Sequence, residues 1–510
     1  MAVTQEQGHV SLKLVVNKET NKVLFAEAGK DFVDVLFSFL TLPLGTIVRL
    51  LEKESNIGPV TIGCLNSLYH SVTDLDNCLW NRTFKEILLQ PRNSSQDYCN
   101  SLKLNIDDSD SKYYVCTDFG SCSCFQLIPY TTTLNCRYGF PLTRTAFSEN
   151  FCNGFVNAAA SFIVTDDLIV MPNSVDYTTF ALLQNLGIKS PSSVKEMTVN
   201  VNKEKVLDLL KCSLLSKTSL TNLFLEKKPI PERSRFLSFS SEEYSCIKIM
   251  LKLVIRKSDG KILYAQGEKD FADLVLSFLT FPLGGVVSKL GGNCSLGSID
   301  GLYKSIADLN DNKYLMSKEA KNRLLDPHLL PQFKLSNKIL SMDVLRYSYR
   351  YVYANGERIL YVQFFKGEYE NKSNLKCYEV FPTVDFEGFV KGPAMYVVTD
   401  DLVVAPLSPI SALNLLNRLN TPFNDLKEKV VTIGLKEVRV HVVLLSILCH
   451  TFVFWSFYAR LNFTSILSYN FSFYVVVLVQ CLNILKASLT STSALTNGLG
   501  RLLTEVKEEK

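Results

Sequence analysis

The feature that most constrains this chain of 510 residues is an internal repeat, because its two halves carry the same sequence blocks in the same order. Residues 12–45 align without a gap on residues 251–284, at an offset of 251 − 12 = 239. The box VTDDL occurs at residues 164–168 and again at residues 398–402. Repeated sequence blocks indicate repeated structural units. We therefore predict two similar domains that pack as a pseudo-twofold pair.

The blocks and the composition between them set the predicted domain limits. The first repeat domain is predicted at residues 8–225, and residues 226–245, with two prolines and several serines, have the composition of a linker. The second domain is predicted at residues 246–437 plus 481–500 and precedes a charged tail at 501–510.

Each half begins with the pattern of a β-hairpin followed by helices. Apolar and polar residues alternate over residues 12–16 and 23–26, on either side of a polar turn. Asp31 is predicted to cap a helix that carries apolar residues at helical spacing. Pro43 stands where a second helix can begin, because a helix start needs no N–H from that residue.

The middle of each half predicts strands, and its end predicts a helix. Residues 113–170 and 347–404 are rich in Tyr, Phe, Val and Thr, with a group of cysteines in the first half. Residues 206–214 have the apolar spacing of a closing amphipathic helix. Because strands and helices are partly segregated along the chain, we predict an α+β fold.

Three of these blocks resemble a known family. The opening LKLVVNKETNKVLFAEAGKDFVDVLFSFLTLPLGTIVRLL, the box VTDDL and the closing LKASLTSTSALTNGL are similar to the plant family named domain of unknown function 674. Members of that family commonly carry such duplicated units, and no activity is assigned to them. The resemblance therefore implies a duplicated fold and supplies no mechanism.

The second half contains an apolar segment without a counterpart in the first. Lys203 aligns with Lys436 at an offset of 233 and Lys211 with Lys486 at 275, which leaves an excess of 275 − 233 = 42 residues near 438–480. One interpretation is a transmembrane helix at 440–458 with a short return span, so that residues 440–478 attach the chain to a membrane. Another is a translated, retained intron, and a third is a buried insertion. We favour the intron.

Four cysteines of the first half are candidate metal ligands. Cys116, Cys122, Cys124 and Cys136 lie within 21 residues (136 − 116 + 1), and four thiolates can hold a structural Zn²⁺ tetrahedrally. Most of them have no counterpart in the second half. The alternative, which we favour, is that they are reduced cysteines packing as small apolar groups.

Other recurring polar residues also have two interpretations. The acidic pairs at 166–167 and 400–401 could bind a divalent cation, but each separates two strand-like runs, and we favour a turn. Lys30 and Lys269 could bind an anion near a helix start, but we favour solvated surface lysines. None of the five histidines recurs in the other half, which argues against a catalytic triad that both halves share.

Composition bears on partners and location. The 54 Lys and Arg residues nearly balance the 50 Asp and Glu residues, so no nucleic-acid partner is expected. The first residues lack the basic and apolar regions of a signal peptide, which favours the cytoplasm or nucleus, with a membrane as the alternative through 440–478.

The residues shared by the two halves are mainly apolar, capping or turn-forming, which fold maintenance requires. We therefore predict a non-enzymatic binding protein with unknown protein partners. An enzyme with a single site between the halves is the alternative, and a membrane-attached variant depends on residues 440–478.

Overall fold

The structure is a computed structural model. It describes residues 8–80, 82–109, 153–173, 186–188, 190–225, 248–330, 388–434 and 479–504, the isolated residues 184, 227, 229 and 342, and the backbone of seven further strands. Those strands are β3 (Tyr113–Cys116), β4 (Leu142–Thr145), β10 (Arg346–Ala354), β11 (Glu357–Phe365), β12 (Tyr378–Glu379), β16 (Lys436–Val440) and β17 (Phe473–Val477).

The first half builds a five-stranded antiparallel sheet in the order β6-β5-β2-β1-β7. Its strands are β1 (Val10–Asn17), β2 (Lys22–Gly29), β5 (Ser161–Thr165), β6 (Val170–Pro172) and β7 (Val194–Val201). The apolar side chains of β1 alternate with polar ones, so that Leu12 and Leu14 face the core. The expected hairpin is present, and Asn21 adopts a positive φ of 48° in its turn.

The second half builds a second five-stranded sheet with the equivalent order, β14-β13-β9-β8-β15. Its strands are β8 (Lys248–Arg256), β9 (Ile262–Glu268), β13 (Met395–Thr399), β14 (Val404–Pro406) and β15 (Leu426–Gly434). The likeness extends to an irregularity of register, which falls between Val15 and Val16 in β1 and between Val254 and Ile255 in β8. The position in β8 lies 254 − 15 = 239 residues after the position in β1, which is the offset found in the sequence. Two antiparallel sheets with segregated helices make this an α+β fold.

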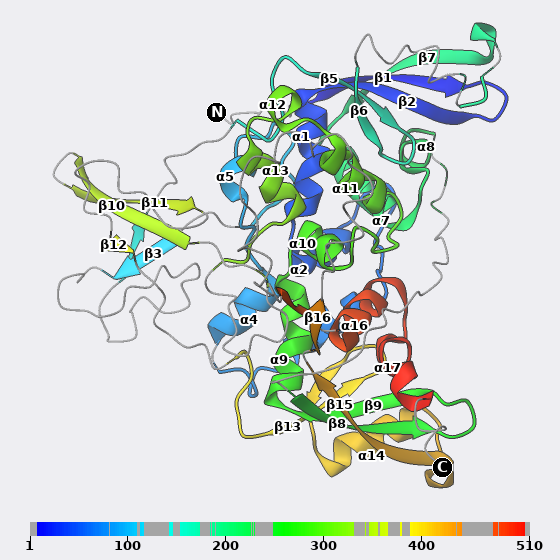
Figure 1. The fold of residues 1–510 in the computed structure, drawn as a ribbon, viewed down its shortest axis with the longest axis vertical. Coiled ribbons are helices and arrows are strands. Elements are labelled where there is room, and N and C mark those ends of the chain that lie inside the picture. The colour runs from blue at the N-terminus through cyan, green and yellow to red at the C-terminus, as the bar shows by residue number, and fades with distance from the viewer. Residues whose placement is uncertain are drawn as a thin grey trace, which may run out of the picture.

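The helices also occur in equivalent series. The first half has α1 (Lys30–Ser38), η1 (Phe39–Thr41), α2 (Leu44–Leu51), α3 (Leu65–Thr73), α4 (Arg82–Leu89), α5 (Gln96–Cys99), η2 (Pro191–Ser193), α7 (Lys203–Leu215) and α8 (Ser219–Phe224). The second has α9 (Lys269–Ser277), η3 (Phe278–Thr280), α10 (Leu283–Lys289), α11 (Ile299–Asp308), α12 (Asp311–Tyr314), α13 (Lys318–Leu325), α14 (Pro409–Arg418), η5 (Phe423–Asp425), α16 (Val479–Thr490) and α17 (Ala494–Thr504). Figure 1 shows one sheet at each end of the body, with helices between them.

Each sheet packs against helices that come from the other half of the chain. Helix α11 contacts β6 of the first sheet, and α3 contacts β14 of the second. The Met316 N–H donates to the Phe155 carbonyl (2.8 Å), and the Trp80 N–H donates to the Phe389 carbonyl (3.1 Å). The two halves thus exchange their middle helices reciprocally.

A single hydrophobic cluster runs through both halves as a result of this exchange. It contains buried residues of the first half, such as Leu14 and Phe32, together with residues of the second, such as Leu253 and Phe271. The order of the two sheets is compatible with two similar domains, but the core is shared between them. The domain limits proposed from the sequence stay a prediction.

One helix has no described counterpart in the first half. Helix α14 lies across the outer face of the second sheet, where a smaller cluster joins Leu415 and Leu416 to Val254, Tyr264 and Val397. Its first turn is held by a capping box, in which the Ser408 hydroxyl accepts from the Ser411 N–H (3.0 Å).

The Cys- and Tyr-rich regions contain the strands that their composition predicts. Strands β10, β11 and β12 form a three-stranded sheet, and β3 pairs with β4. Figure 1 shows these strands to one side of the main body.

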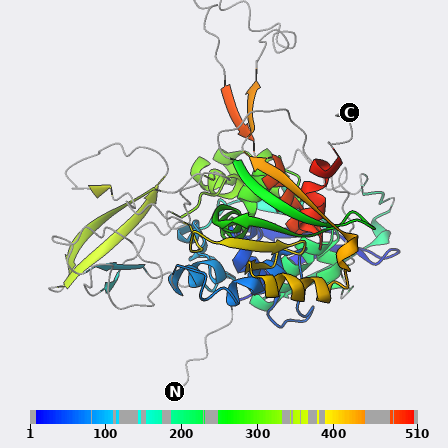
Figure 2. The same cartoon turned by 90° about the horizontal axis from the view of Figure 1, so that it is seen from below.

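The excess residues of the second half lie between β15 and α16. In the first half a single residue, Asn202, separates β7 from α7 and caps the helix by accepting from the Lys205 N–H (2.9 Å). In the second half residues 435–478 occupy this position. Their described parts, β16 and β17, form an antiparallel pair that stands away from the body in Figure 2.

Little of the predicted membrane segment can be compared with the structure. Residues 441–472, which include most of the predicted helix at 440–458, lie outside the described residues. Part of the predicted return span is the strand β17. None of the helices in the described part of the chain has the length and apolar character that crossing a bilayer requires.

Candidate functional site

The acidic pairs of the VTDDL boxes lie in tight turns that follow β5 and β13. Each turn is closed by a backbone hydrogen bond, from the Leu168 N–H to the Thr165 carbonyl and from the Leu402 N–H to the Thr399 carbonyl, both at 2.9 Å. The two leucines have positive φ angles, 61° and 64°, and are fully buried. The turn that we favoured from the sequence is therefore present in both halves.

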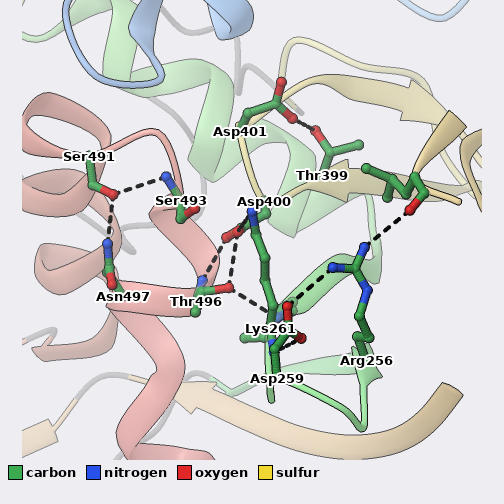
Figure 3. A network of polar contacts seen from close by, with 12 residues as sticks. Arg256, Asp259, Lys261, Thr399, Asp400, Asp401, Ser491, Ser493, Thr496 and Asn497 are labelled. Atoms are coloured by element: carbon green, nitrogen blue, oxygen red, sulfur yellow. Dashed lines mark hydrogen bonds and ion pairs between the residues drawn. The ribbon is translucent and has the colours of Figure 1, made fainter. Parts of the chain in front are cut away.

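The first carboxylate of each pair binds the helix that follows the closing helix, α8 in the first half and α17 in the second, rather than its own turn. Asp166 accepts from the N–H and the hydroxyl of Thr221, both at 2.7 Å. Asp400 accepts from the N–H (2.7 Å) and the hydroxyl (3.0 Å) of Thr496, as Figure 3 shows. The pattern that identifies this site is thus a pair of blocks that both recur, VTDDL and the later Leu-Thr-Asn.

The threonine hydroxyls extend each network to the hairpin. Thr221 Oγ1 accepts from the Val23 N–H at 2.9 Å, and Thr496 Oγ1 accepts from the Ile262 N–H at 3.0 Å. One hydroxyl therefore joins the turn and the first strand pair to α8 in the first half and to α17 in the second. The second carboxylate, as in Asp401, accepts from the hydroxyl of the threonine two residues before it, Thr399 (2.5 Å).

Burial sets the electrostatics of these carboxyls. Desolvation raises the pKa of Asp166 to about 6, against the lowering effect of the Thr221 hydrogen bonds. Burial also raises the pKa of Asp400, although Lys261 Nζ lies 3.6 Å from its carboxylate (Figure 3). An acid with a raised pKa in a cleft could act in proton transfer, but here both oxygens already accept protein donors.

A second recurring carboxylate was missed by the sequence reasoning. Asp34 accepts from the backbone N–H groups of Phe155 (2.7 Å) and Val156 (2.8 Å), and Asp273 accepts from those of Phe389 (2.7 Å) and Val390 (3.0 Å). Burial raises the pKa of Asp34, and it raises that of Asp273 to about 6. The signal in the sequence is the recurring Gly-Phe-Val, at 154–156 and 388–390.

The glycine of this motif is required by space as well as by conformation. Gly154 and Gly388 have φ angles of +76° and +115°, and a Cβ atom added to either would overlap the aspartate carboxylate. The backbone can therefore approach Asp34 and Asp273 only where there is no side chain.

Two predictions about the helix start are wrong. Asp31 does not cap the helix, because α1 begins at Lys30 and its N-cap residue is Gly29, without a side-chain hydrogen bond. Lys30 is not a solvated surface lysine, since its side chain is 13% exposed. Its ammonium donates to Asp34 (2.6 Å) and to the carbonyls of Asn153 and Val156, so it neutralises the buried carboxylate.

A recurring lysine of the closing helix is buried as well. Lys211 is 0% exposed and its counterpart Lys486 is 4% exposed. The Lys211 ammonium donates to the Lys53 carbonyl (2.7 Å), the Ser55 hydroxyl (2.6 Å) and the Gly58 carbonyl (2.6 Å). Burial lowers the pKa of Lys211, a change that in a free amine favours nucleophilic chemistry. Three acceptors on one ammonium instead bind the helix to the loop after α2.

The predicted zinc ligands lie outside the part of the chain whose side chains are described. Cys122, Cys124 and Cys136 lie outside the described residues, and Cys116 is described only by its backbone at the end of β3. The six cysteines that are described, Cys64, Cys78, Cys99, Cys212, Cys294 and Cys481, are free thiols. No group of three or more potential ligands among the described residues could hold a metal ion.

Comparison with known families agrees with the resemblance seen in the blocks. Residues 6–436 match the family described as "Protein of unknown function (DUF674)". The chain belongs to the DUF674 family. Neither a curated protein nor a solved structure matches it. The matched DUF674 region ends at Lys436, two residues before the excess segment at 438–480 begins, and it includes both acidic turns.

Proposed function

We propose that this DUF674 chain is a non-enzymatic binding protein whose partner is another protein. The observation that carries the proposal is that its recurring ionisable side chains are occupied by its own fold. Asp34 accepts from two backbone N–H groups, Asp166 from Thr221, and Lys211 donates to three oxygen atoms. A catalytic acid, base or nucleophile must be able to reach a substrate atom, and these groups are held within structural contacts.

Exposed apolar side chains of the second half suggest where a protein partner would bind. Ile410 is 72% exposed, Phe423 71%, Met250 67% and Val430 60%. Met250 and Val430 lie on neighbouring strands, in diagonal positions of the same sheet face. Neighbouring large exposed apolar side chains, such as Met250 and Val430, are typical of a protein interface.

The test is capture of the partner by the full-length chain after crosslinking in the cells that produce it. We expect one protein at about equimolar amount, because a specific interface fixes the stoichiometry. The variant with Ile410→Asp and Phe423→Asp should lose it, whereas the control with Asn414→Asp and Asn417→Asp, which adds the same charge on α14, should keep it. Equal recovery by both variants, or no stoichiometric partner, would refute the proposal.

For Cys116, Cys122, Cys124 and Cys136 the zinc site stays a proposal beside the reduced thiols that we favour. Mass spectrometry of the intact protein under native conditions decides between them. One zinc per chain that is lost on Cys124→Ser supports the metal site, and its absence supports the thiols.

We also propose that this is a plant protein of the cytoplasm or nucleus and that residues 438–480 come from a retained intron. The agreement between the end of the family match and the start of this segment supports the intron. Sequencing the mature transcript across residues 437–481 tests it, and a message that always retains the segment favours membrane attachment instead.

A further inference from the structure

The two halves meet through pairs of aligned residues. The Leu44 N–H donates to the Phe281 carbonyl and the Leu283 N–H donates to the Leu42 carbonyl, both at 2.9 Å. Leu42 aligns with Phe281 and Leu44 with Leu283 at the offset of 239. When residue i contacts j and the counterpart of j contacts the counterpart of i, the interface has twofold, self-complementary geometry. Two separate subunits of a homodimer meet in this way.

The same reciprocity continues away from the centre. The Cys64 N–H donates to the Ser488 carbonyl, and its counterpart, the Ser298 N–H, donates to the Ser213 carbonyl, both at 2.8 Å. Gly63 and Gly297, which precede them, have positive φ angles, and each lies against the backbone that accepts this bond. Contacts made by backbone atoms and small residues depend little on which half supplies them, so they favour like and unlike pairs equally.

One buried contact breaks the reciprocity. Arg323 is 3% exposed, and it donates to the Ser94 carbonyl of the other half (3.0 Å) and to Glu319 of its own helix (2.9 Å). Its Nη2 atom lies 4.0 Å from the carboxylate of Asp97, also in the first half. The residue that aligns with Arg323 in the first half is Ile87, at an offset of 323 − 87 = 236. Ile87 is buried and apolar.

The first-half side that faces Arg323 also differs from its counterpart in the second half. Asp97 aligns with Phe333 at the same offset of 236, whereas the Ser94 contact is a backbone carbonyl that its counterpart Leu330 also has. In a pair of two second halves Arg323 would keep Glu319 of its own helix and lose the second carboxylate, Asp97. In a pair of two first halves Asp97 would face Ile87 and lose its cation. The Asp97 side chain is 10% exposed, and a buried carboxylate without its cation is strongly unfavourable, whereas one with its partner is tolerated.

We propose that the face between the halves is a self-complementary docking surface for any half of this fold, and that Arg323 and Asp97 restrict it to the unlike half. The partner that this surface fits is thus the other half of the same chain. The reciprocal backbone contacts hold any two halves together, and the contact between Arg323 and Asp97 makes the unlike pair the more stable one.

The test uses the full-length chain with a protease site placed in residues 226–245 and a different tag at each end. After cleavage of the folded protein, we expect the wild-type halves to stay together as a one-to-one pair by light scattering. We also expect no like pairs when the cleaved protein is mixed with untagged cleaved protein and the mixture is unfolded and refolded together. Separation of the wild-type halves into monomers would overturn the docking surface.

The specificity is tested with Arg323→Ile, which places the residue of the first half at the aligned position. Like pairs of second halves should rise at least about tenfold over wild type, because their formation no longer costs the contact between Arg323 and Asp97. The matched control is Arg256→Ile, since Arg256 bonds Thr421 and the Leu419 carbonyl within the second half, and like pairs should stay at the wild-type level.

If Arg323→Ile fails to fold, Asp97→Asn tests the same contact, because it removes the negative charge and preserves the shape of the side chain. Like pairs of first halves should then rise. Specificity is refuted if the proportion of like pairs in a folded Arg323 or Asp97 variant equals that of the wild type.

Discussion

Replacement of Thr221 by valine tests whether the acidic turn is a structural joint. Thr221 is 2% exposed, and its hydroxyl accepts from the Val23 N–H at 2.9 Å and donates to Asp166 at 2.7 Å. Valine has the same shape without the hydroxyl. The variant therefore leaves a buried N–H and one carboxylate oxygen without the group that now binds them, while the packing is unchanged.

The expected loss follows from these two bonds. A buried N–H left without an acceptor costs about 1–3 kcal/mol, and a hydrogen bond to a charged group contributes about 1.5–3 kcal/mol. Asp166 keeps the bond from the Thr221 N–H at 2.7 Å, which limits the damage. We expect the free energy of unfolding to fall by about 3 kcal/mol, which for a cooperative unit of about 500 residues with a shared core lowers the Tm by roughly 3 °C.

Calorimetry gives the change in Tm, and hydrogen exchange at the Val23 amide shows whether the lost bond is its cause. The control is Thr198→Val, because Thr198 is exposed on β7 and a strand tolerates valine there. If the Tm of Thr221→Val lies within 1 °C of the control and the Val23 amide stays protected, the hydroxyl is not a joint and the reasoning fails.

Three further predictions concern pH, packing and the excess segment. The folded pKa of Asp166, about 6, exceeds its ordinary 3.8, so its neutral carboxyl stabilises the fold most below about pH 4. Up to roughly 3 kcal/mol of this stability is lost as the pH rises through 6. The Tm of Asp166→Asn should therefore fall less than that of the wild type over this pH range. Gly154→Ala should lower the Tm far more than Gly58→Ala, which has a similar φ (+78°) and open space; equal losses would contradict the overlap with Asp34. Deletion of residues 438–479 should leave far-UV circular dichroism and Tm unchanged or improved, and a chain that no longer folds would show that the segment is needed.

Local patterns in the sequence predicted the elements that depend on local physics. The alternation of apolar residues in β1 identified the hairpin, and the spacing of Val206, Leu209 and Leu210 identified α7, because burial of one face produces both periods. The acidic turn at 166–167 was predicted from its position between two strand-like runs. Its partner was not, since Thr221 lies 55 residues further along the chain.

The error at the start of α1 has a similar cause. Asp31 followed by Asp34 has the spacing of a capped helix, so both were assigned to the start of the helix. In the fold Asp34 is 1% exposed and binds the Phe155 and Val156 N–H groups, more than 120 residues away. A carboxylate that binds a distant loop has no local signature; only the recurrence of Gly-Phe-Val in both halves pointed to it.

The exchange of middle helices could not have been predicted from a repeat at all. An arrangement in which α11 covers the first sheet and one in which it covers the second bury the same apolar residues, because the two sheets present equivalent faces. Exchange of identical elements leaves every contact type unchanged, so aligned sequences carry no preference between the two arrangements. Only a residue that differs between the halves can distinguish them. Arg323, opposite Asp97 where the other half has Ile87, is such a residue, and the unlike pair is selected because the buried Asp97 would otherwise lose its cation.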